Sequence, residues 1–101
     1  MRHPLCKLTE IPESGTRVVP FFGREIHLYR HGGEPKAALS ICPHLGGPLS
    51  CEGGRLVCPW HGAEFSLSDG RRLKPPAAID ARLMFLPTRA EGDTLYYVWG
   101  E

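Results

Sequence analysis

Glycine and proline are spread so evenly along this chain that they limit the length of every secondary-structure element. The 101 residues include 12 glycines and 10 prolines, and the longest stretch free of both is the ten residues 77–86. Helices of ordinary length need more uninterrupted chain than this, whereas strands are short enough to fit between such residues. The spacing therefore predicts an all-β fold and excludes a helical bundle.

Five segments have the β-branched, aromatic or alternating composition that is typical of strands. We expect strands at residues 5–9, 17–22, 25–30, 36–41 and 94–99. Gly23 and Arg24 predict a two-residue hairpin turn between the second and third of these. We expect Tyr96, Tyr97 and Trp99 to pack in the core. Residues 42–69 are dominated by turn residues and predict an irregular insert.

Charge and hydropathy exclude several classes of partner. Twelve Lys and Arg against eleven Asp and Glu leave a formal net charge of +1, which is too small to concentrate nucleic acid or anionic lipid. No apolar run of about 18 residues could span a bilayer. Pro4 and Lys7 interrupt the region where a signal peptide would be apolar. We therefore expect a cytoplasmic protein with no nucleic acid or membrane partner, whose cysteines are thiols or metal ligands rather than disulfides.

Two short motifs in the insert carry metal-binding side chains. They are Cys42-Pro43-His44 and, after 13 intervening residues, Cys58-Pro59-Trp60-His61. Each offers one thiolate and one imidazole, so two such loops can hold one centre from both sides. Structural zinc accepts two Cys and two His, but its usual sites group like ligands together and place the histidines on a helix. A 2Fe-2S cluster with two histidines on one iron matches one Cys and one His in each motif.

The octapeptides CPHLGGPL at residues 42–49 and CPWHGAEF at residues 58–65 resemble the two cluster-binding loops of Rieske proteins, and especially of the small Rieske ferredoxins. The resemblance covers nearly the whole chain. It implies a single domain, residues 1–101, with an antiparallel β-sandwich base, a cluster-binding subdomain at about residues 42–68 and a proline-containing third loop at about residues 74–77. It also implies that Cys42 and Cys58 bind the inner iron of one Rieske 2Fe-2S cluster, and His44 and His61 the outer iron.

The resemblance further implies a one-electron carrier of aromatic-ring dioxygenase systems that has no catalytic residues of its own. We expect a monomer that takes electrons from a flavin reductase and passes them to an oxygenase or a similar acceptor. High-potential members of the family have an inter-loop disulfide and hydroxyls that donate hydrogen bonds to sulfur, and this chain has Gly47, Trp60, Ala63 and Phe65 at those positions. We therefore predict a potential of roughly −150 mV, in a range that reaches about +300 mV.

Three other interpretations remain open at this point. The chain could be a reductase subunit, since it resembles the small 2Fe-2S subunit of assimilatory nitrite reductase. It could also be a redox-sensing module, or an interaction domain that a bound zinc ion stabilises. The remaining cysteines and histidines are expected to bind no metal. Cys6 should be a small buried apolar residue, Cys51 a thiol in a hairpin between the two loops, and His3, His27 and His31 surface residues.

Overall fold

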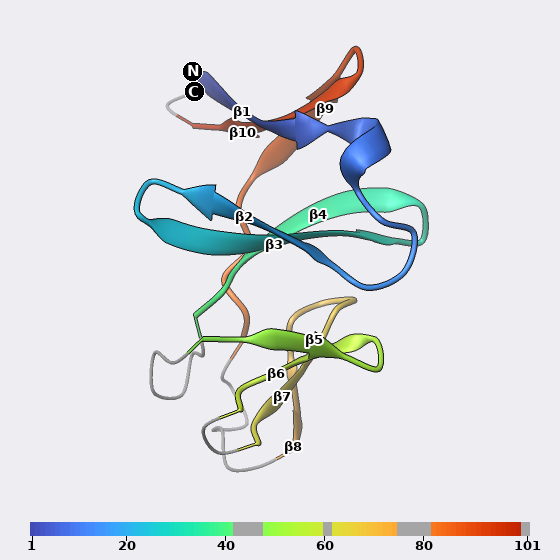
Figure 1. The fold of residues 1–101 in the computed structure, drawn as a ribbon, viewed down its shortest axis with the longest axis vertical. Coiled ribbons are helices and arrows are strands. Elements are labelled where there is room, and N and C mark those ends of the chain that lie inside the picture. The colour runs from blue at the N-terminus through green and yellow to red at the C-terminus, as the bar shows by residue number, and fades with distance from the viewer. Residues whose placement is uncertain (42–47, 60–61, 75–81, 100–101) are drawn as a thin grey trace.

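The computed structural model describes residues 1–41, 48–59, 62–74 and 82–99. These residues form three antiparallel sheets that follow one another along the long axis of the molecule (Figure 1). In spatial order the upper sheet contains β1 (Arg2–Lys7), β10 (Thr94–Val98) and β9 (Thr88–Glu91). The middle sheet contains β2 (Arg17–Phe21), β3 (Arg24–His31) and β4 (Glu34–Leu39). The lower sheet contains β5 (Ser50–Glu52), β6 (Arg55–Val57), β7 (Glu64–Ser66) and β8 (Arg72–Lys74).

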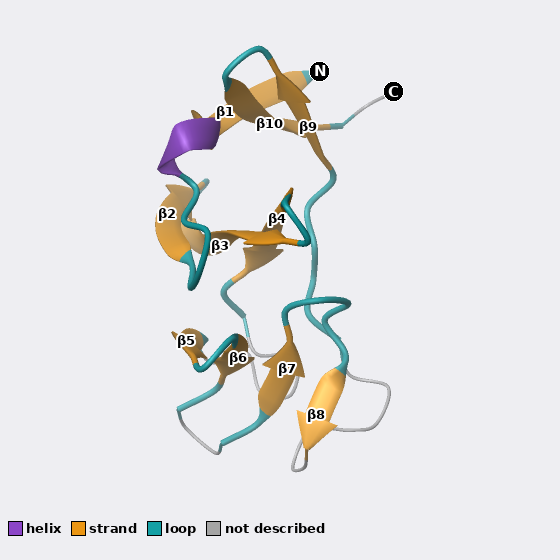
Figure 2. Cartoon of the chain, turned by 90° about the vertical axis from the view of Figure 1, so that its right-hand side faces the viewer, coloured by secondary structure: helices purple, strands orange, loops and turns teal. Residues whose placement is uncertain are grey.

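The all-β prediction is confirmed, although β1 ends earlier than expected. The chain turns at η1 (Leu8–Glu10), a 3-10 helix (Figure 2), where the sequence predicted continued strand. The Lys7 backbone N–H donates to the Glu10 carboxylate at 2.8 Å, and the Leu8 N–H donates to the Asp93 carbonyl at 2.7 Å. The first bond closes the turn at η1, and the second ties the start of η1 to the residue before β10. The described residues include no helix long and apolar enough to cross a membrane.

The hairpin between β2 and β3 has its turn one residue earlier than predicted. Phe21 pairs with Arg24, so Phe22 and Gly23 form the turn, with φ angles of 48° and 81°. Positive φ at both positions matches the twist of a two-residue hairpin. A positive φ is energetically costly for a residue with a bulky side chain such as Phe22. Phe22 remains 69% exposed and contacts His3, with ring centroids 4.7 Å apart.

Strand β3 is the centre of the molecule because both of its faces are covered. Ile26 and Leu28 are completely buried in a cluster with Leu95 of the upper sheet. Tyr29 is completely buried on the other face, in a cluster with Leu56 and Phe65 of the lower sheet. Alternation along one strand therefore joins two hydrophobic cores, which between them bind all three sheets together.

The expected insert is more regular than its composition indicated. The residues described between positions 48 and 74 form four strands of three residues each. Such short strands carry too few positions for a period of two to be visible in the sequence. The hairpin expected between the two loops is confirmed, because β5 pairs with β6 in antiparallel register.

The aromatic residues of β10 lie nearer the surface than expected. Leu95 is buried, but Tyr96, Tyr97 and Trp99 are only half-buried. Tyr97 stacks on Trp99 with centroids 5.0 Å apart and meets the edge of Phe21 at 5.1 Å. The prediction that these three rings pack in the core is wrong. Alternation places Tyr96 on the face opposite Leu95, whereas Tyr97 and Trp99 share the face of Leu95 but stay half-buried.

Gly70 is a position where a side chain should be poorly tolerated. Its φ is 76°, and an added Cβ would lie 2.7 Å from Phe85 Cε2 and 3.0 Å from Leu83 Cβ. Gly33 has a similar φ of 82° with nothing within 4 Å. We expect Gly33→Ala to lower the free energy of unfolding by about 1 kcal/mol through backbone strain alone. Gly70→Ala should lose about 1–3 kcal/mol more through overpacking. Urea unfolding followed by circular dichroism measures both, and equal losses would contradict the steric argument.

Candidate metal centre

Backbone hydrogen bonds hold together the described ends of the second predicted loop. The Cys58 N–H donates to the Ala63 carbonyl at 2.8 Å, and the Gly62 N–H donates to the Cys58 carbonyl at 2.8 Å. Cys58 and Ala63 are both completely buried. The motif that begins at Cys58 therefore starts and ends at one fixed point between β6 and β7.

The first predicted loop is closed in a similar way, by a side chain. The Leu49 N–H donates to Ser40 Oγ at 3.2 Å, and the same hydroxyl lies 3.2 Å from the Leu49 carbonyl. Ser40 follows β4, and Leu49 precedes β5. The segment that carries Cys42 and His44 is thereby anchored at both ends to the middle sheet.

Strand register places the flanks of the loops at one end of the lower sheet. Ser50 pairs with Val57, so Leu49 and Cys58 both lie just beyond the open end of the β5–β6 hairpin. Glu64 pairs with Lys74, so the residues after β8 leave from the end at which β7 begins. The two motifs and the expected third loop are thus connected to neighbouring strand ends, which is the arrangement that a shared centre requires.

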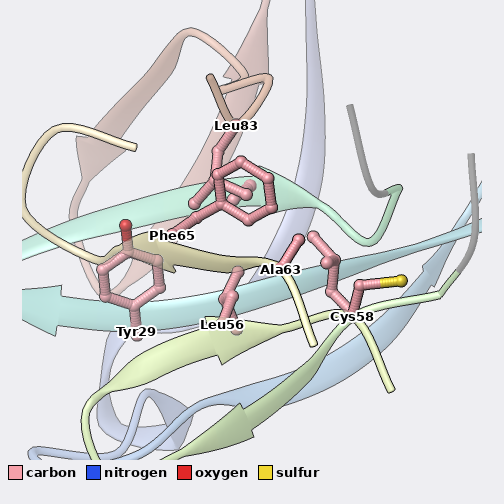
Figure 3. Packing of buried hydrophobic residues seen from close by; sticks show 8 residues of the cluster. Tyr29, Leu56, Cys58, Ala63, Phe65 and Leu83 are labelled. Carbon is pink, nitrogen blue, oxygen red and sulfur yellow. The ribbon is translucent and has the colours of Figure 1, made fainter. Parts of the chain in front are cut away.

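The Cys58 sulfur is directed out of the lower hydrophobic cluster. In Figure 3 the side chains of Leu56, Ala63 and Phe65 pack together, while the sulfur of Cys58 points away from them. The residue is nevertheless 0% exposed. A buried thiol that points away from its own hydrophobic cluster is suited to serve as a metal ligand.

Only part of the predicted site lies within the described residues. Cys58 is described, whereas Cys42, His44 and His61 lie outside the described residues. Gly47, Trp60 and the prolines of the third loop also fall outside them. Ala63 and Phe65 are described and completely buried. The resemblance places them where high-potential Rieske proteins have hydroxyl side chains.

Several polar groups of the lower sheet have partners of their own. Arg55 Nε lies 2.6 Å from Glu64 Oε1, which joins β6 to β7 on the rim of the sheet. The Ser66 hydroxyl lies 2.6 Å from that of Ser68. The Tyr29 hydroxyl donates to the Leu67 carbonyl at 2.6 Å. Burial raises the pKa of Tyr29, so the hydroxyl keeps its proton and remains a donor.

His27 is a buried residue of this region that the sequence placed wrongly at the surface. It is 1% exposed, and the Thr16 hydroxyl lies 2.8 Å from Nδ1. Its Nε2 lies 3.0 Å from the Leu49 carbonyl, which can only accept, so Nε2–H is the donor and Nδ1 accepts from Thr16. Burial lowers the pKa of His27, although the bond to Leu49 and the charge of Glu25 oppose this.

The expectations for the other cysteines and histidines are met in part. His31 is exposed as predicted, and His3 is half-buried against Phe21 and Phe22. Cys6 is half-buried rather than buried, and burial raises its pKa. Cys51 is a half-buried free cysteine in the β5–β6 hairpin.

The fold and these loop flanks define a small β-protein with a candidate two-loop metal centre at one end. The protein family described as "Rieske [2Fe-2S] domain" matches residues 1–84 of the chain. The chain is 33% identical over 88 residues to the ferredoxin component of the naphthalene 1,2-dioxygenase system of Pseudomonas aeruginosa, covering 84% of this chain and 83% of that protein. It therefore belongs to the Rieske 2Fe-2S family.

Two further relatives define the extent of the likeness. The chain is 45% identical over 58 residues to the oxygenase component of chloroacetanilide N-alkylformylase of Rhizorhabdus wittichii, covering 54% of this chain but 16% of that protein. The ferredoxin of Sphingomonas yanoikuyae B1 has the same fold, with a TM-score of 0.77 and 18% identity over 99% of this chain and 100% of that one. The match is thus with one domain of an oxygenase component but with the full length of a ferredoxin.

The cofactor of this family fits the residues present. Family membership assigns a Rieske-type 2Fe-2S cluster to the chain, and the relatives matched along most of their length are electron-transfer components rather than catalytic ones. Two thiolates and two imidazoles are the donor set that such a cluster needs. The buried Cys58 lies at the end of the lower sheet where the loop flanks meet.

The buried state of His27 should make folding stability depend on pH. The unfolded chain takes up a proton near the ordinary pKa of 6.5, whereas the folded chain resists it to lower pH. The stability that neutral His27 contributes is therefore present above that value and lost as the pH falls through the lowered pKa. Urea unfolding between about pH 7.5 and about pH 5 should show a wild-type stability that falls relative to His27→Gln. His31→Gln should parallel the wild type, and the same parallel for His27→Gln would contradict this prediction.

Proposed function

We propose that the chain is a single Rieske domain, residues 1–101, that carries one electron at a time from a flavin reductase to an oxygenase or a similar acceptor. Cys42 and Cys58 bind one iron of the cluster, and His44 and His61 bind the other. When bound, the cluster accepts and releases one electron without opening a coordination position to substrate. The observation that carries the proposal is the meeting of both motif flanks at one end of the lower sheet, with the Cys58 sulfur buried there.

The relatives support a role among other redox proteins. A ferredoxin component belongs to a system of several proteins, so redox partner proteins follow from the relatives. We further propose that the donor is a flavin reductase and the acceptor an oxygenase or a similar protein, and that the chain is a cytoplasmic monomer. Cys6 and Cys51 are free cysteines, which is compatible with a reducing compartment.

Spectroscopy of anaerobically purified protein tests the cofactor and the carrier role together. Iron, sulfide and zinc are quantified, and absorption and low-temperature EPR spectra are recorded before and after dithionite. We expect two irons per chain and a rhombic EPR signal only in the reduced state. Reduction by NADH through a dioxygenase-type flavin reductase, with cytochrome c as final acceptor, then tests electron transfer. A colourless protein with one zinc would overturn the proposal.

The proposed ligand set predicts different effects for two neighbouring cysteines. Cys58→Ala removes a thiolate ligand, so the purified variant should lose essentially all cluster iron. Cys51→Ala is the matched control, since Cys51 is a half-buried free cysteine of the adjacent hairpin. It should keep the wild-type iron content. Iron retained by Cys58→Ala, with an unchanged EPR signal, would remove Cys58 from the ligand set.

The buried alanine at position 63 predicts how the potential can be raised. Ala63 is joined to Cys58 by a backbone hydrogen bond, and the methyl group at this position donates nothing to sulfur. A serine hydroxyl there would stabilise the more negative, reduced cluster. One hydrogen bond of about 1.4 kcal/mol corresponds to about 60 mV for one electron. Ala63→Ser should therefore raise the midpoint potential by about 60 mV from its low wild-type value.

Protein-film voltammetry at neutral pH measures this shift. Ser66→Ala is the control, because Ser66 is at the end of β7 away from Ala63 and its hydroxyl is engaged by Ser68. The control should leave the potential unchanged. A wild-type midpoint above about +100 mV would contradict the low-potential assignment, and an unchanged potential in Ala63→Ser would contradict the role of the missing hydroxyl.

A further inference from the structure

Two buried polar side chains lie on the lower face of β3, two residues apart. His27 is 1% exposed and Tyr29 0% exposed. Residues i and i+2 of a strand share a face, so both project from the middle sheet toward the lower sheet. Tyr29 belongs to the hydrophobic cluster between the middle and lower sheets, and the other buried residues of that cluster are apolar.

His27 is bonded to the end of the first loop. Its Nε2–H reaches the Leu49 carbonyl at 3.0 Å, and the Ser40 hydroxyl lies 3.2 Å from the same nitrogen. Leu49 follows directly on the segment that carries the first motif. Thr16 holds the opposite ring nitrogen at 2.8 Å, so the imidazole cannot rotate without losing a bond.

Tyr29 is bonded to the other half of the lower sheet. Its hydroxyl donates to the Leu67 carbonyl at 2.6 Å. Leu67 follows the last residue of β7, at the end of the strand away from the second motif. Ser66 is the last residue of β7 to pair with β6, so the Leu67 carbonyl lies beyond that ladder and is available to Tyr29.

We propose that His27 and Tyr29 are positioning residues for the metal centre. His27 fixes the end of the first loop, and Tyr29 fixes β7, the strand that the second loop leads into, so both loops are held relative to one rigid strand. The inference rests on the proposed function, because it takes the two motifs as the ligand set. Apolar contacts such as those of Leu56 and Phe65 resist separation of the layers but permit sliding. Directional hydrogen bonds at two separate points prevent sliding as well.

The two contacts would matter most during electron transfer. A centre that changes shape little between oxidation states exchanges electrons with little rearrangement. Outer-shell hydrogen bonds supply this rigidity at metal sites, and their loss typically costs 10–100-fold in metal affinity. His27 would supply it at the backbone that ends the first loop, and Tyr29 at the backbone that ends β7, rather than by contact with a ligand.

Four variants separate positioning from simple stability. Tyr29→Phe removes one hydroxyl and keeps the ring, and His27→Leu removes the hydrogen bonds of both ring nitrogens. His27→Gln keeps a side-chain N–H that can reach the Leu49 carbonyl. Leu28→Ala is the matched control, because Leu28 lies between the two residues, is completely buried, and faces the upper cluster instead.

Two measurements on the cluster-loaded proteins decide the outcome. The first is the rate of iron loss to a ferrous chelator under native conditions, and the second is the set of EPR g-values and line widths of the reduced cluster. We expect Tyr29→Phe and His27→Leu to lose iron about tenfold faster or more and to show broadened or shifted g-values. His27→Gln should recover most of the wild-type behaviour. Leu28→Ala should unfold at lower urea concentration and keep the wild-type EPR spectrum.

Each result supports or overturns a specific statement. If Tyr29→Phe and His27→Leu have the wild-type EPR spectrum and lose iron no faster than Leu28→Ala, the positioning role is overturned while the proposed function stands. If the wild-type protein contains no iron, the proposed function fails first and takes the inference with it. If His27→Leu does not fold, Tyr29→Phe decides alone, since it changes a single oxygen atom.

Discussion

The burial of β3 on both faces is the constraint on which the rest of this structure depends. Ile26 and Leu28 face the upper sheet, and His27 and Tyr29 face the lower one. Because successive side chains of a strand alternate, a shift of one residue in register would exchange the two sets. It would place two polar groups in an apolar core and leave the Leu49 and Leu67 carbonyls without their donors. Register in the middle sheet thus determines where the metal-binding end of the molecule can lie.

A short hairpin then turns a small sheet into a site for two loops. The pairing of Ser50 with Val57 brings Leu49 and Cys58 to the same end of the β5–β6 hairpin, although they are nine positions apart in the chain. Hydrogen bonds at Ser40 and Ala63 close the described ends of the segments that carry the two motifs. The loops can therefore be rich in glycine and proline, because the strands beneath them supply the order. This division between a regular base and irregular functional loops is common in binding proteins.

Local patterns in the sequence were sufficient for the fold class and the motifs. Glycine and proline spacing excludes helices directly, and Cys and His at short spacing mark a metal site whatever surrounds them. The position of His27 was not accessible in this way. It occupies the polar side of an alternating strand, and only the packing of the lower sheet onto that side makes it buried. The four three-residue strands of the lower sheet were missed for a related reason, since their order comes from partners distant in sequence.

The two polar residues on the lower face of β3, His27 and Tyr29, illustrate a balance between stability and specificity. Replacing His27 by an apolar residue would remove the cost of burying an imidazole, but it would leave the Leu49 carbonyl and the Thr16 hydroxyl without this partner. A neutral imidazole with one donor and one acceptor satisfies both neighbours at once, which no aliphatic side chain can do. Tyr29 follows the same logic with a ring that fills the core and a hydroxyl that reaches Leu67. The two residues therefore cost little in stability and define one arrangement of the lower sheet on the middle one, which a purely apolar interface between short strands would define less sharply.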